Sequence, residues 1–200
     1  MRLYISTGSP FARKCRIVLR EKGLEGRVEE AALLYPYQER TELVAANPIG
    51  QVPTLVDDDG VVFTNSPVIC AYLDSHGEGP RLSPPEGPAH WASRRTETLA
   101  DAALEMAVKI ALEGRRPAAE QSAQWLGWWQ AGLLRALDQA EQDAPDEDAP
   151  LDIGQIALGV LGPYIDFRQP NLDWRAGRPR LAAFTRRMDQ RPSFAATRPS

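Results

Sequence analysis

Apolar residues form four short runs in the first third of the chain, and each run predicts a β-strand. The first three runs cover residues 3–5, 28–33 and 54–56. Residues 57–60 follow the third run and end in Asp-Gly, the dipeptide typical of a tight hairpin turn, so we expect a return strand at residues 61–63. These runs predict a small β-sheet.

Three segments beside these runs have the pattern of helices. Residues 10–22 carry apolar side chains at positions i, i+4, i+7 and i+8, which gives a helix one apolar face. Residues 38–46 predict a short connecting helix, and residues 68–73 are apolar nearly all round, as in a buried helix. The order strand, helix, strand predicts a parallel pair with a right-handed crossover. The apolar face of the first helix holds Phe11, Cys15, Val18 and Leu19.

Glycine and proline are dense between residues 76 and 88, where no regular element is expected. We therefore predict a first domain at residues 1–76, a linker at residues 77–88 and a second domain at residues 89–200. The second domain has only helical periodicity. Its predicted helices cover residues 89–113, 118–142, 156–167 and 179–191, with a tail from residue 192.

Two features of the second domain add to this prediction. Asp152 and Gln155 have the spacing of a capping box, which would start the third of its helices. The buried stripe of the first helix is expected to run from Trp91 to Ile110. A group of tryptophans in the second helix predicts either core packing or a dimer interface rather than a ligand site. This group consists of Trp125, Trp128 and Trp129.

The composition is that of an ordinary globular protein, with 43% hydrophobic and 25% charged residues among 200. A net charge of -4 argues against nucleic acid or an anionic membrane as the main partner. No apolar run approaches the roughly 18 residues of a membrane span, and no secretory signal pattern opens the sequence. We therefore expect a cytoplasmic protein with no membrane partner.

The residues that commonly bind metals are few and scattered. The two cysteines, Cys15 and Cys70, have neither the spacing of a metal site nor that of a disulfide framework. The two histidines, His76 and His90, lie in or beside the glycine- and proline-rich segment. We expect no metal, and we expect Cys15 to be a core residue, because a free cysteine is usually buried.

The start of the first helix carries the chemistry. Ser9-Pro10 places a capping hydroxyl and a first-turn proline directly after a predicted strand and a short loop. Free N–H groups and the positive end of the helix dipole meet there, which suits an anion. Ser66-Pro67 has the same pattern of a helix start, with Ser66 as the expected N-cap. We expect the anion at Ser9 to be a thiolate carried by a ligand.

Three segments, in this order, resemble the cytosolic glutathione S-transferase family in its bacterial, serine-type form. The resemblance extends over essentially the whole chain, and the capped helix after Asp152 and the final Arg-Pro-Ser-Phe agree with it. The three segments are Ser9-Pro10-Phe11, residues 47–53 with the sequence Asn-Pro-Ile-Gly-Gln-Val-Pro, and Asn65-Ser66-Pro67.

The resemblance implies an α/β thioredoxin-like N-terminal domain, an all-α C-terminal domain and a homodimer. It implies reduced glutathione as co-substrate and a small apolar electrophile as the second substrate. The implied activity is transfer of alkyl or aryl groups to glutathione, as in detoxification. It also implies a cis peptide bond between Val52 and Pro53.

Ser9 matches the family position that contacts the glutathione sulfur, and we expect it to be the catalytic residue. A serine hydroxyl is not a base near neutral pH, so its expected role is to donate a hydrogen bond to the thiolate. Tyr4 is a rival for this contact, because tyrosine-type relatives exist, but it lies within the strand and comes too early.

The other expected glutathione-binding residues also follow from the resemblance. The main chain of Val52 would pair with the cysteinyl part of glutathione, with Pro53 beside it, and Ser66 would bind the γ-glutamyl carboxylate. Gln51 lies where relatives carry a basic or amide side chain near the glycine end. Phe11 and Asn65 complete the expected set.

This chain departs from the family pattern at one of these positions. Many relatives carry an acidic residue where this chain has Asn65, so the affinity for glutathione is expected to be lower. Asp101 is a candidate to supply the missing carboxylate from a partner subunit. Arg13 or Lys14 could assist at the glycine end, but we expect Arg13 to be solvated.

The electrophile site is the least defined. Its apolar candidates are Phe11, Tyr35, Trp91 and Met106. Two alternative functions stay open from the sequence. One is a glutathione-dependent peroxidase or disulfide-bond reductase, which needs no protein cysteine because two glutathione molecules can do the chemistry. The other is a non-catalytic binding protein with the transferase fold.

Overall fold

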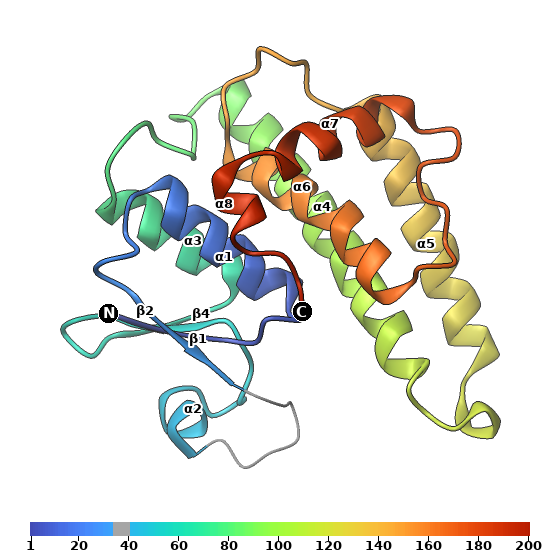
Figure 1. Ribbon diagram of the computed structural model, residues 1–200, viewed down its shortest axis with the longest axis horizontal. Coiled ribbons are helices and arrows are strands. Elements are labelled where there is room, and N and C mark those ends of the chain that lie inside the picture. Colours follow the sequence, from blue (N-terminus) through green and yellow to red (C-terminus); the bar gives the residue numbers. More distant parts are fainter. Residues whose placement is uncertain (34–40) are drawn as a thin grey trace. The chain divides into compact units, whose positions relative to one another are not determined.

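The computed structural model describes residues 1–33 and 41–200, and these form two compact units (Figure 1). One unit combines Met1–Ser83 with Pro192–Ser200, and the other is Pro84–Arg191. The first holds a four-stranded sheet with helices, and the second is helical. The expected combination of an α/β domain and an all-helical domain is confirmed.

The sheet has the strand order β2-β1-β3-β4. Its strands are β1 (Arg2–Ile5), β2 (Glu29–Ala32), β3 (Thr54–Val56) and β4 (Val62–Thr64). Strand β1 is parallel to β2, as the crossover predicts, and antiparallel to β3. Strands β3 and β4 form the predicted hairpin. The turn is fixed by Asp57, whose carboxylate accepts the N–H of Val61 at 2.8 Å.

Helices α1 (Pro10–Glu21) and α3 (Ser66–His76) lie side by side on one face of this sheet, and α2 (Thr41–Ala46) lies on the other (Figure 1). The predicted helix at 38–46 is therefore present from Thr41, and its first three residues lie outside the described part. The expected apolar face of α1 is buried except at Phe11, which is half-buried.

The last nine residues pack onto α1, which differs from the predicted second domain at 89–200. Helix α8 (Pro192–Ala195) buries Phe194 against Arg13, whose guanidinium lies 5.6 Å from the ring and donates to the Phe194 carbonyl at 3.3 Å. Arg13 is only 1% exposed, so the expectation of a solvated side chain is wrong. Arg13 is covered by Phe194, which lies 181 positions further along the chain.

A buried ion pair fixes part of the segment predicted as a linker. Lys22 Nζ lies 3.2 Å from Asp74 Oδ1 and donates to the Pro80 carbonyl at 2.9 Å. The Asp74 carboxylate accepts the N–H groups of Leu82 at 2.9 Å and Ser83 at 3.1 Å. A buried charge is tolerated when it is paired and its hydrogen bonds are satisfied, so this pair attaches residues 79–83 to the first unit.

The helical unit is built around α6 (Ile153–Arg168), which packs against α4 (Pro88–Glu113) and α7 (Pro179–Asp189). Helix α6 is buried on nearly all sides, as predicted, and α4 also packs against α5 (Ala123–Gln142). Helix α5 starts later than the predicted residue 118. Ser122 caps it by accepting the Trp125 N–H at 3.3 Å, and a short 3₁₀ turn, Ala118–Glu120, precedes it.

The predicted cap of α6 is present at Asp152, whose Oδ1 accepts the Gln155 N–H at 2.8 Å. The Gln155 side chain donates to the Pro150 carbonyl at 2.8 Å, so it holds the preceding loop as well. Gly154 follows the cap, and a Cβ there would lie 2.5 Å from the Ser93 carbonyl oxygen. The absence of a side chain at Gly154 therefore lets α6 approach α4.

The tryptophans differ in exposure. Trp125 and Trp128 are 55% and 66% exposed, so core packing is excluded for these two residues, and a dimer interface stays a prediction. Trp91 is 65% exposed and lies outside the buried stripe of α4. The fully buried tryptophan is Trp174, which comes from a segment predicted as a loop. Its ring lies against Gly162 of α6, where a Cβ would be 2.5 Å from the indole.

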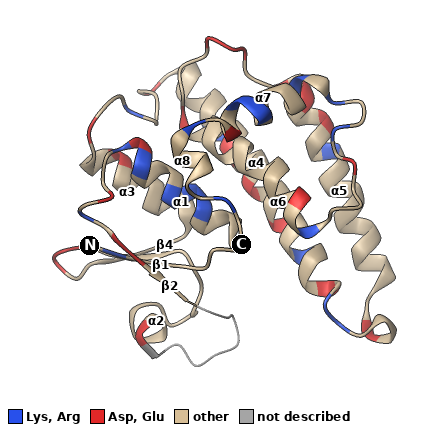
Figure 2. Cartoon of the chain, in the orientation of Figure 1, with Lys and Arg blue, Asp and Glu red and all other residues tan. Residues whose placement is uncertain are grey.

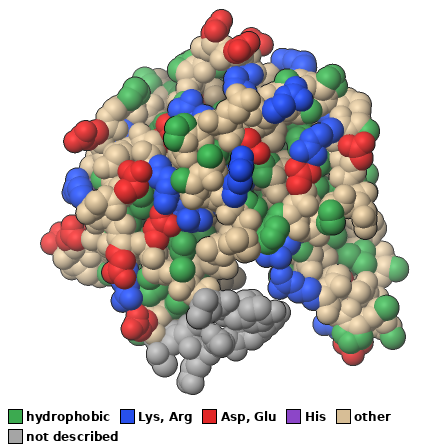
Figure 3. Space-filling view, viewed as in Figure 1, with side chains coloured by type: hydrophobic (Ala, Val, Ile, Leu, Met, Phe, Trp, Pro, Cys, Tyr) green, Lys and Arg blue, Asp and Glu red, His purple; other side chains and the backbone are tan. Residues whose placement is uncertain are grey.

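Charged side chains of both signs are interspersed over the described surface drawn in Figure 3, and Figure 2 shows the same mixture along the elements. Among the described residues, no helix has both the length and the apolar character needed to span a bilayer. In the same part of the chain, no three metal-binding side chains gather into a cluster.

Asp166 of α6 binds two residues of the loop that follows this helix, Trp174 and Arg175. The Arg175 guanidinium donates to both carboxylate oxygens, at 2.7 and 2.6 Å, and the Trp174 indole donates at 2.9 Å. Burial raises the pKa of Asp166, but the hydrogen bonds from Arg175 and Trp174 outweigh it and leave the pKa below its usual range. The ionised carboxylate therefore stabilises the fold.

The substitution Asp166→Asn is expected to destabilise the helical unit at neutral pH by about 1 kcal/mol, because the ion pair is half-exposed and screened. A lowered pKa in the folded state contributes stability above the unfolded pKa of about 3.9 and loses it as pH falls through the folded value. Thermal unfolding of the wild type and of Asp166→Asn between pH 7 and pH ~3 measures this. The difference in melting temperature between the two proteins should become smaller toward pH ~3.

The matched control for this experiment is Asp148→Asn, which removes the same charge from an exposed loop. If the difference in melting temperature between the wild type and Asp166→Asn stays constant across the acid range, the stabilising role of the ionised Asp166 carboxylate is contradicted.

Candidate functional site

The register of the sheet brings three separate segments to one edge. Tyr4 pairs with Thr54, and Thr54 pairs with Thr64 on its other side. The end of β1, the start of β3 and the end of β4 therefore lie next to one another. Strands β1 and β4 run in the same direction, because both are antiparallel to β3. Helices α1 and α3, which follow them, both begin at this edge.

Ser9 is the N-cap of α1 and is half-buried. Its backbone is extended, and its Oγ accepts the Ala12 N–H at 3.2 Å. Pro10 follows as the first helical residue. Because proline has no backbone N–H, the first turn has one fewer N–H group without an acceptor. Capping uses a lone pair of the Ser9 oxygen, and the O–H hydrogen is a separate donor. The same hydroxyl can therefore cap the helix and donate to an anion.

Helix α3 begins differently from the prediction. Asn65, rather than Ser66, occupies the N-cap position, and Ser66 is the first helical residue, 2% exposed. Asn65 has a φ of 70° and is exposed, and it is the one non-glycine residue with positive φ in the described ranges. Asparagine tolerates this conformation better than most residues, and such outliers concentrate at functional sites.

The segment before β3 reaches the same edge, with a cis peptide bond between Val52 and Pro53, as the resemblance implies. Val52 is half-buried and Gln51 is exposed. The preceding loop is held by Asn47, which is buried and donates to the Gln51 carbonyl at 3.1 Å and to Thr54 Oγ1 at 3.0 Å. Thr54 Oγ1 donates in turn to the Gln51 carbonyl at 2.8 Å.

Asn47 is a positioning residue whose role the sequence prediction missed. Its Oδ1 also accepts the Ile49 N–H at 3.1 Å, so one side chain fixes both ends of the loop. The sequence feature that pointed to this loop was the Asn-Pro pair. This pair predicts a turn, but it does not reveal that the asparagine is buried.

The electrostatics of this edge favour an anion. Two helix N-termini converge there, and neither α1 nor α3 has an acidic residue in its first turn. N–H groups in a first helical turn have no acceptor within the helix. The edge therefore offers a hydroxyl and first-turn donors to negative groups, and an extended main chain at Val52 to a peptide-like ligand.

The remaining first-unit candidates are less favourably placed. Tyr4 is buried in β1, with the Arg2 guanidinium 5.2 Å from its ring, which agrees with its rejection as a sulfur contact. Lys14 is fully buried, so it is not a solvated residue. Cys15 is a core residue, as predicted, and its Sγ lies 3.7 Å from that of Cys70.

The candidates for the electrophile site are dispersed. Phe11 belongs to the first unit, and Tyr35 lies outside the described residues. Met106 packs against α5 at Gly132, where a Cβ would lie 2.6 Å from its sulfur. Trp91 contacts His90 edge-on at 5.2 Å. Asp101 is half-buried on α4.

Comparison with known proteins places this geometry in a family. Residues 8–76 match the family model described as the glutathione S-transferase N-terminal domain. An uncharacterised GST-like protein of Escherichia coli K12, YibF, is 32% identical over 202 residues, which is 100% of this chain and 98% of that protein.

Solved structures agree over the whole chain. A glutathione transferase family member from Pseudomonas fluorescens Pf-5, solved with bound glutathione, is 35% identical with a TM-score of 0.94, covering 100% of this chain and 98% of that one. A glutathione S-transferase from Methylobacterium radiotolerans, in complex with glutathione sulfonate, is 34% identical with a TM-score of 0.90, covering 99% and 94%. The chain belongs to the glutathione S-transferase family.

Proposed function

We propose that this protein is a serine-type glutathione transferase, in which Ser9 stabilises the thiolate of bound glutathione for attack on an apolar electrophile. The observation that carries the proposal is the Ser9 hydroxyl, which caps α1 through its oxygen and keeps a hydrogen to donate. The Pseudomonas fluorescens relative has also been solved with S-(propanoic acid)-glutathione, a glutathione joined through sulfur to another group.

The free energy required is modest. A thiol with a pKa of roughly 8.5 is mostly protonated at neutral pH, and each unit of depression needs about 1.4 kcal/mol of preferential thiolate stabilisation. One charge-assisted hydrogen bond and a helix N-terminus together supply about one to two units. Binding then holds the sulfur near its target, which adds the advantage of proximity.

Glutathione would extend along the edge of the sheet. The main chain of Val52, next to Pro53, pairs with the cysteinyl part, and Ser66 binds the γ-glutamyl carboxylate at the start of α3. Gln51 and Phe11 lie at the sides of the ligand. Asn65 faces the ligand amino group as a neutral amide, so it contributes less affinity than a carboxylate would.

We further propose that the protein acts as a cytoplasmic homodimer. Exposed indoles on α5 support the dimer, because Trp125 and Trp128 are more exposed than large aromatic side chains usually are in a monomer. Trp125 stacks on Trp129 of the same helix, with ring centroids 5.8 Å apart. The reduced, buried cysteines agree with a reducing compartment.

The substitution Ser9→Ala is expected to raise the pKa of the bound glutathione thiol by about one unit, because the hydroxyl donor is lost while the helix N-terminus remains. Titration of the thiolate ultraviolet band in the complex measures this pKa directly. Ser6→Ala is the matched control, since Ser6 lies in the same loop and supports Ser9 through its carbonyl, which accepts the Ser9 N–H at 3.0 Å. An unshifted thiol in the wild-type complex would overturn the catalytic role of Ser9.

The substitution Asn47→Ala is expected to weaken glutathione binding by about tenfold, because the loop that presents Val52 loses three side-chain hydrogen bonds. Calorimetric titration with glutathione gives the affinity, and the thiolate pKa at saturation should stay at the wild-type value. A change in that pKa without a change in affinity would contradict a positioning role.

The substitution Trp128→Glu is expected to shift the protein from dimer to monomer, since it places a charge in an apolar contact. Sedimentation equilibrium measures the mass, and Gln124→Glu adds the same charge to an exposed position of the same helix. A monomeric wild-type protein would refute the dimer and leave the glutathione site untouched.

A further inference from the structure

Two cysteines from different helices meet inside the first unit. Cys15 lies on α1 and Cys70 on α3, and these two helices pack against each other. The Sγ atom of Cys70 lies 3.7 Å from that of Cys15, and the two residues are 1% and 0% exposed. They are the only two cysteines of the sequence. All the thiols of the chain are therefore in contact at one point between α1 and α3.

Packing alone does not require thiols at these two positions. A free cysteine in a core packs as a small apolar residue, so alanine or valine would serve the same purpose. What distinguishes a thiol is its reactivity, and two thiols in contact have a reaction that a single buried thiol lacks. Oxidation can join their sulfur atoms in a disulfide bond.

The cysteine pair also contacts the start of α3. The Cys15 thiol donates to the Ser66 carbonyl at 3.9 Å. Ser66 and Cys70 are four residues apart and lie on the same face of α3. Cys15 therefore touches both ends of the first turn of this helix. Because Ser66 is the residue expected to bind the γ-glutamyl carboxylate, a change in the cysteine pair acts on the candidate glutathione site.

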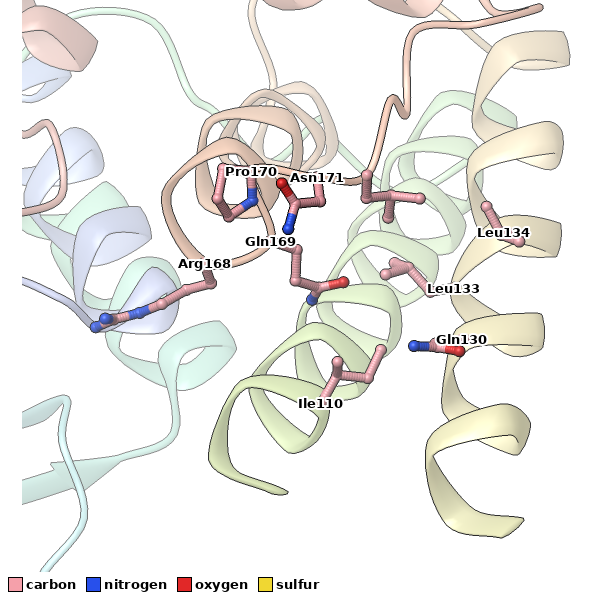
Figure 4. Close-up of a pocket in the computed structure, with 9 residues that line it drawn as sticks. Ile110, Gln130, Leu133, Leu134, Arg168, Gln169, Pro170 and Asn171 are labelled. Atoms are coloured by element: carbon pink, nitrogen blue, oxygen red, sulfur yellow. The ribbon is translucent and has the colours of Figure 1, made fainter. Parts of the chain in front are cut away.

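The access to the pair limits the oxidant to a small molecule. Two hollows in the helical unit, the larger of which is drawn in Figure 4, have no cysteine among their lining residues. The two thiols are covered by packed side chains, so an oxidant reaches them through brief local openings of the core. Hydrogen peroxide, the smallest hydroperoxide, is suited to such openings.

We propose that hydrogen peroxide joins Cys15 and Cys70 in a reversible disulfide bond, and that this bond lowers the affinity of the protein for glutathione. Disulfides in a reducing cytosol are usually transient and serve catalysis or redox sensing. The effect on glutathione rests on the proposed function, whereas the formation of the bond is independent of it.

The reaction consumes one molecule of hydrogen peroxide in two steps. First, the sulfur of one thiol attacks a peroxide oxygen and the O–O bond breaks, which gives a sulfenic acid and water. The other sulfur then attacks the sulfenic sulfur, the S–O bond breaks, and a second water molecule leaves with the remaining thiol hydrogen. Each sulfur loses one electron, and the peroxide oxygens gain the pair. Two molecules of a small thiol, which become a disulfide themselves, return the electrons in the reverse reaction.

Formation of the bond changes the contact between α1 and α3. The S–S bond length is about 2.05 Å, so the two sulfur atoms must approach each other by about 1.7 Å. In a close-packed interior, such a movement is transmitted to the neighbouring atoms. The first turn of α3 shifts with Cys70, and the Ser66 carbonyl loses the thiol hydrogen of Cys15. A ligand held at Ser66 then fits less well.

Mass spectrometry of the wild-type protein after treatment with hydrogen peroxide tests the bond. The intact mass should fall by that of two hydrogen atoms, and a digest without reductant should contain the Cys15 and Cys70 peptides joined together. Dithiothreitol should restore the original mass. After removal of the peroxide, the oxidised protein should bind S-methylglutathione about tenfold more weakly than the reduced protein. This probe has no thiol that would reduce the bond.

Cys15→Ala and Cys70→Ala are the matched controls, because each leaves a single thiol in the same core. Peroxide should not lower the mass of either variant, and each should bind S-methylglutathione equally well before and after treatment. Oxidation of the three methionines adds oxygen, so it raises the mass and affects the wild type and both variants alike.

Free thiols in the folded wild type after peroxide treatment would overturn the proposal, and so would oxygen added to sulfur without joined peptides. Equal affinity of the oxidised and reduced wild type for S-methylglutathione would refute the effect on the site. If the reduced wild type does not bind this probe, the proposed glutathione site is refuted together with its regulation, and the mass measurement still decides whether the bond forms.

Discussion

The antiparallel pairing of β3 with both β1 and β4 is the constraint on which the candidate site depends. Because β3 runs opposite to both neighbours, β1 and β4 end at the same edge, and the helices that follow them must start there. Two positive helix ends then meet beside the segment that enters β3. The hydroxyl groups of Ser9 and Ser66 owe their placement to this pairing of very short strands. A slip of one residue in the register would separate them.

Local patterns in the sequence predict most of the elements and their order. The alternation of short apolar runs and helical faces was sufficient for the sheet, the parallel first pair and the hairpin, because these depend on neighbouring residues. Helix starts were predicted less well. Ser-Pro correctly marks the start of α1, but at α3 the same dipeptide lies one residue inside the helix, because Asn65 adopts a left-handed backbone that the sequence does not reveal.

Contacts between distant residues were beyond prediction. Arg13 is polar and lies on a helix, so a solvated position was the natural expectation, and only the packing of residues 192–200 buries it. Trp174 is a similar case, since a loop residue becomes core because Gly162 leaves space for its ring. For the site, the motif positions were identifiable from the sequence, whereas the role of Asn47 requires knowledge of which carbonyl its amide reaches.

The attachment of residues 192–200 to the first unit has a consequence for biosynthesis. The α/β unit is discontinuous in sequence, and the helical unit is inserted within it. During translation, the ribosome must produce the whole helical unit before α8 can cover Arg13 and before Ser200 can accept the Thr7 hydroxyl hydrogen bond in the loop ahead of Ser9. The unit that is made first is therefore completed last, and in a nascent chain that stalls before residue 192 the loop ahead of Ser9 lacks these contacts.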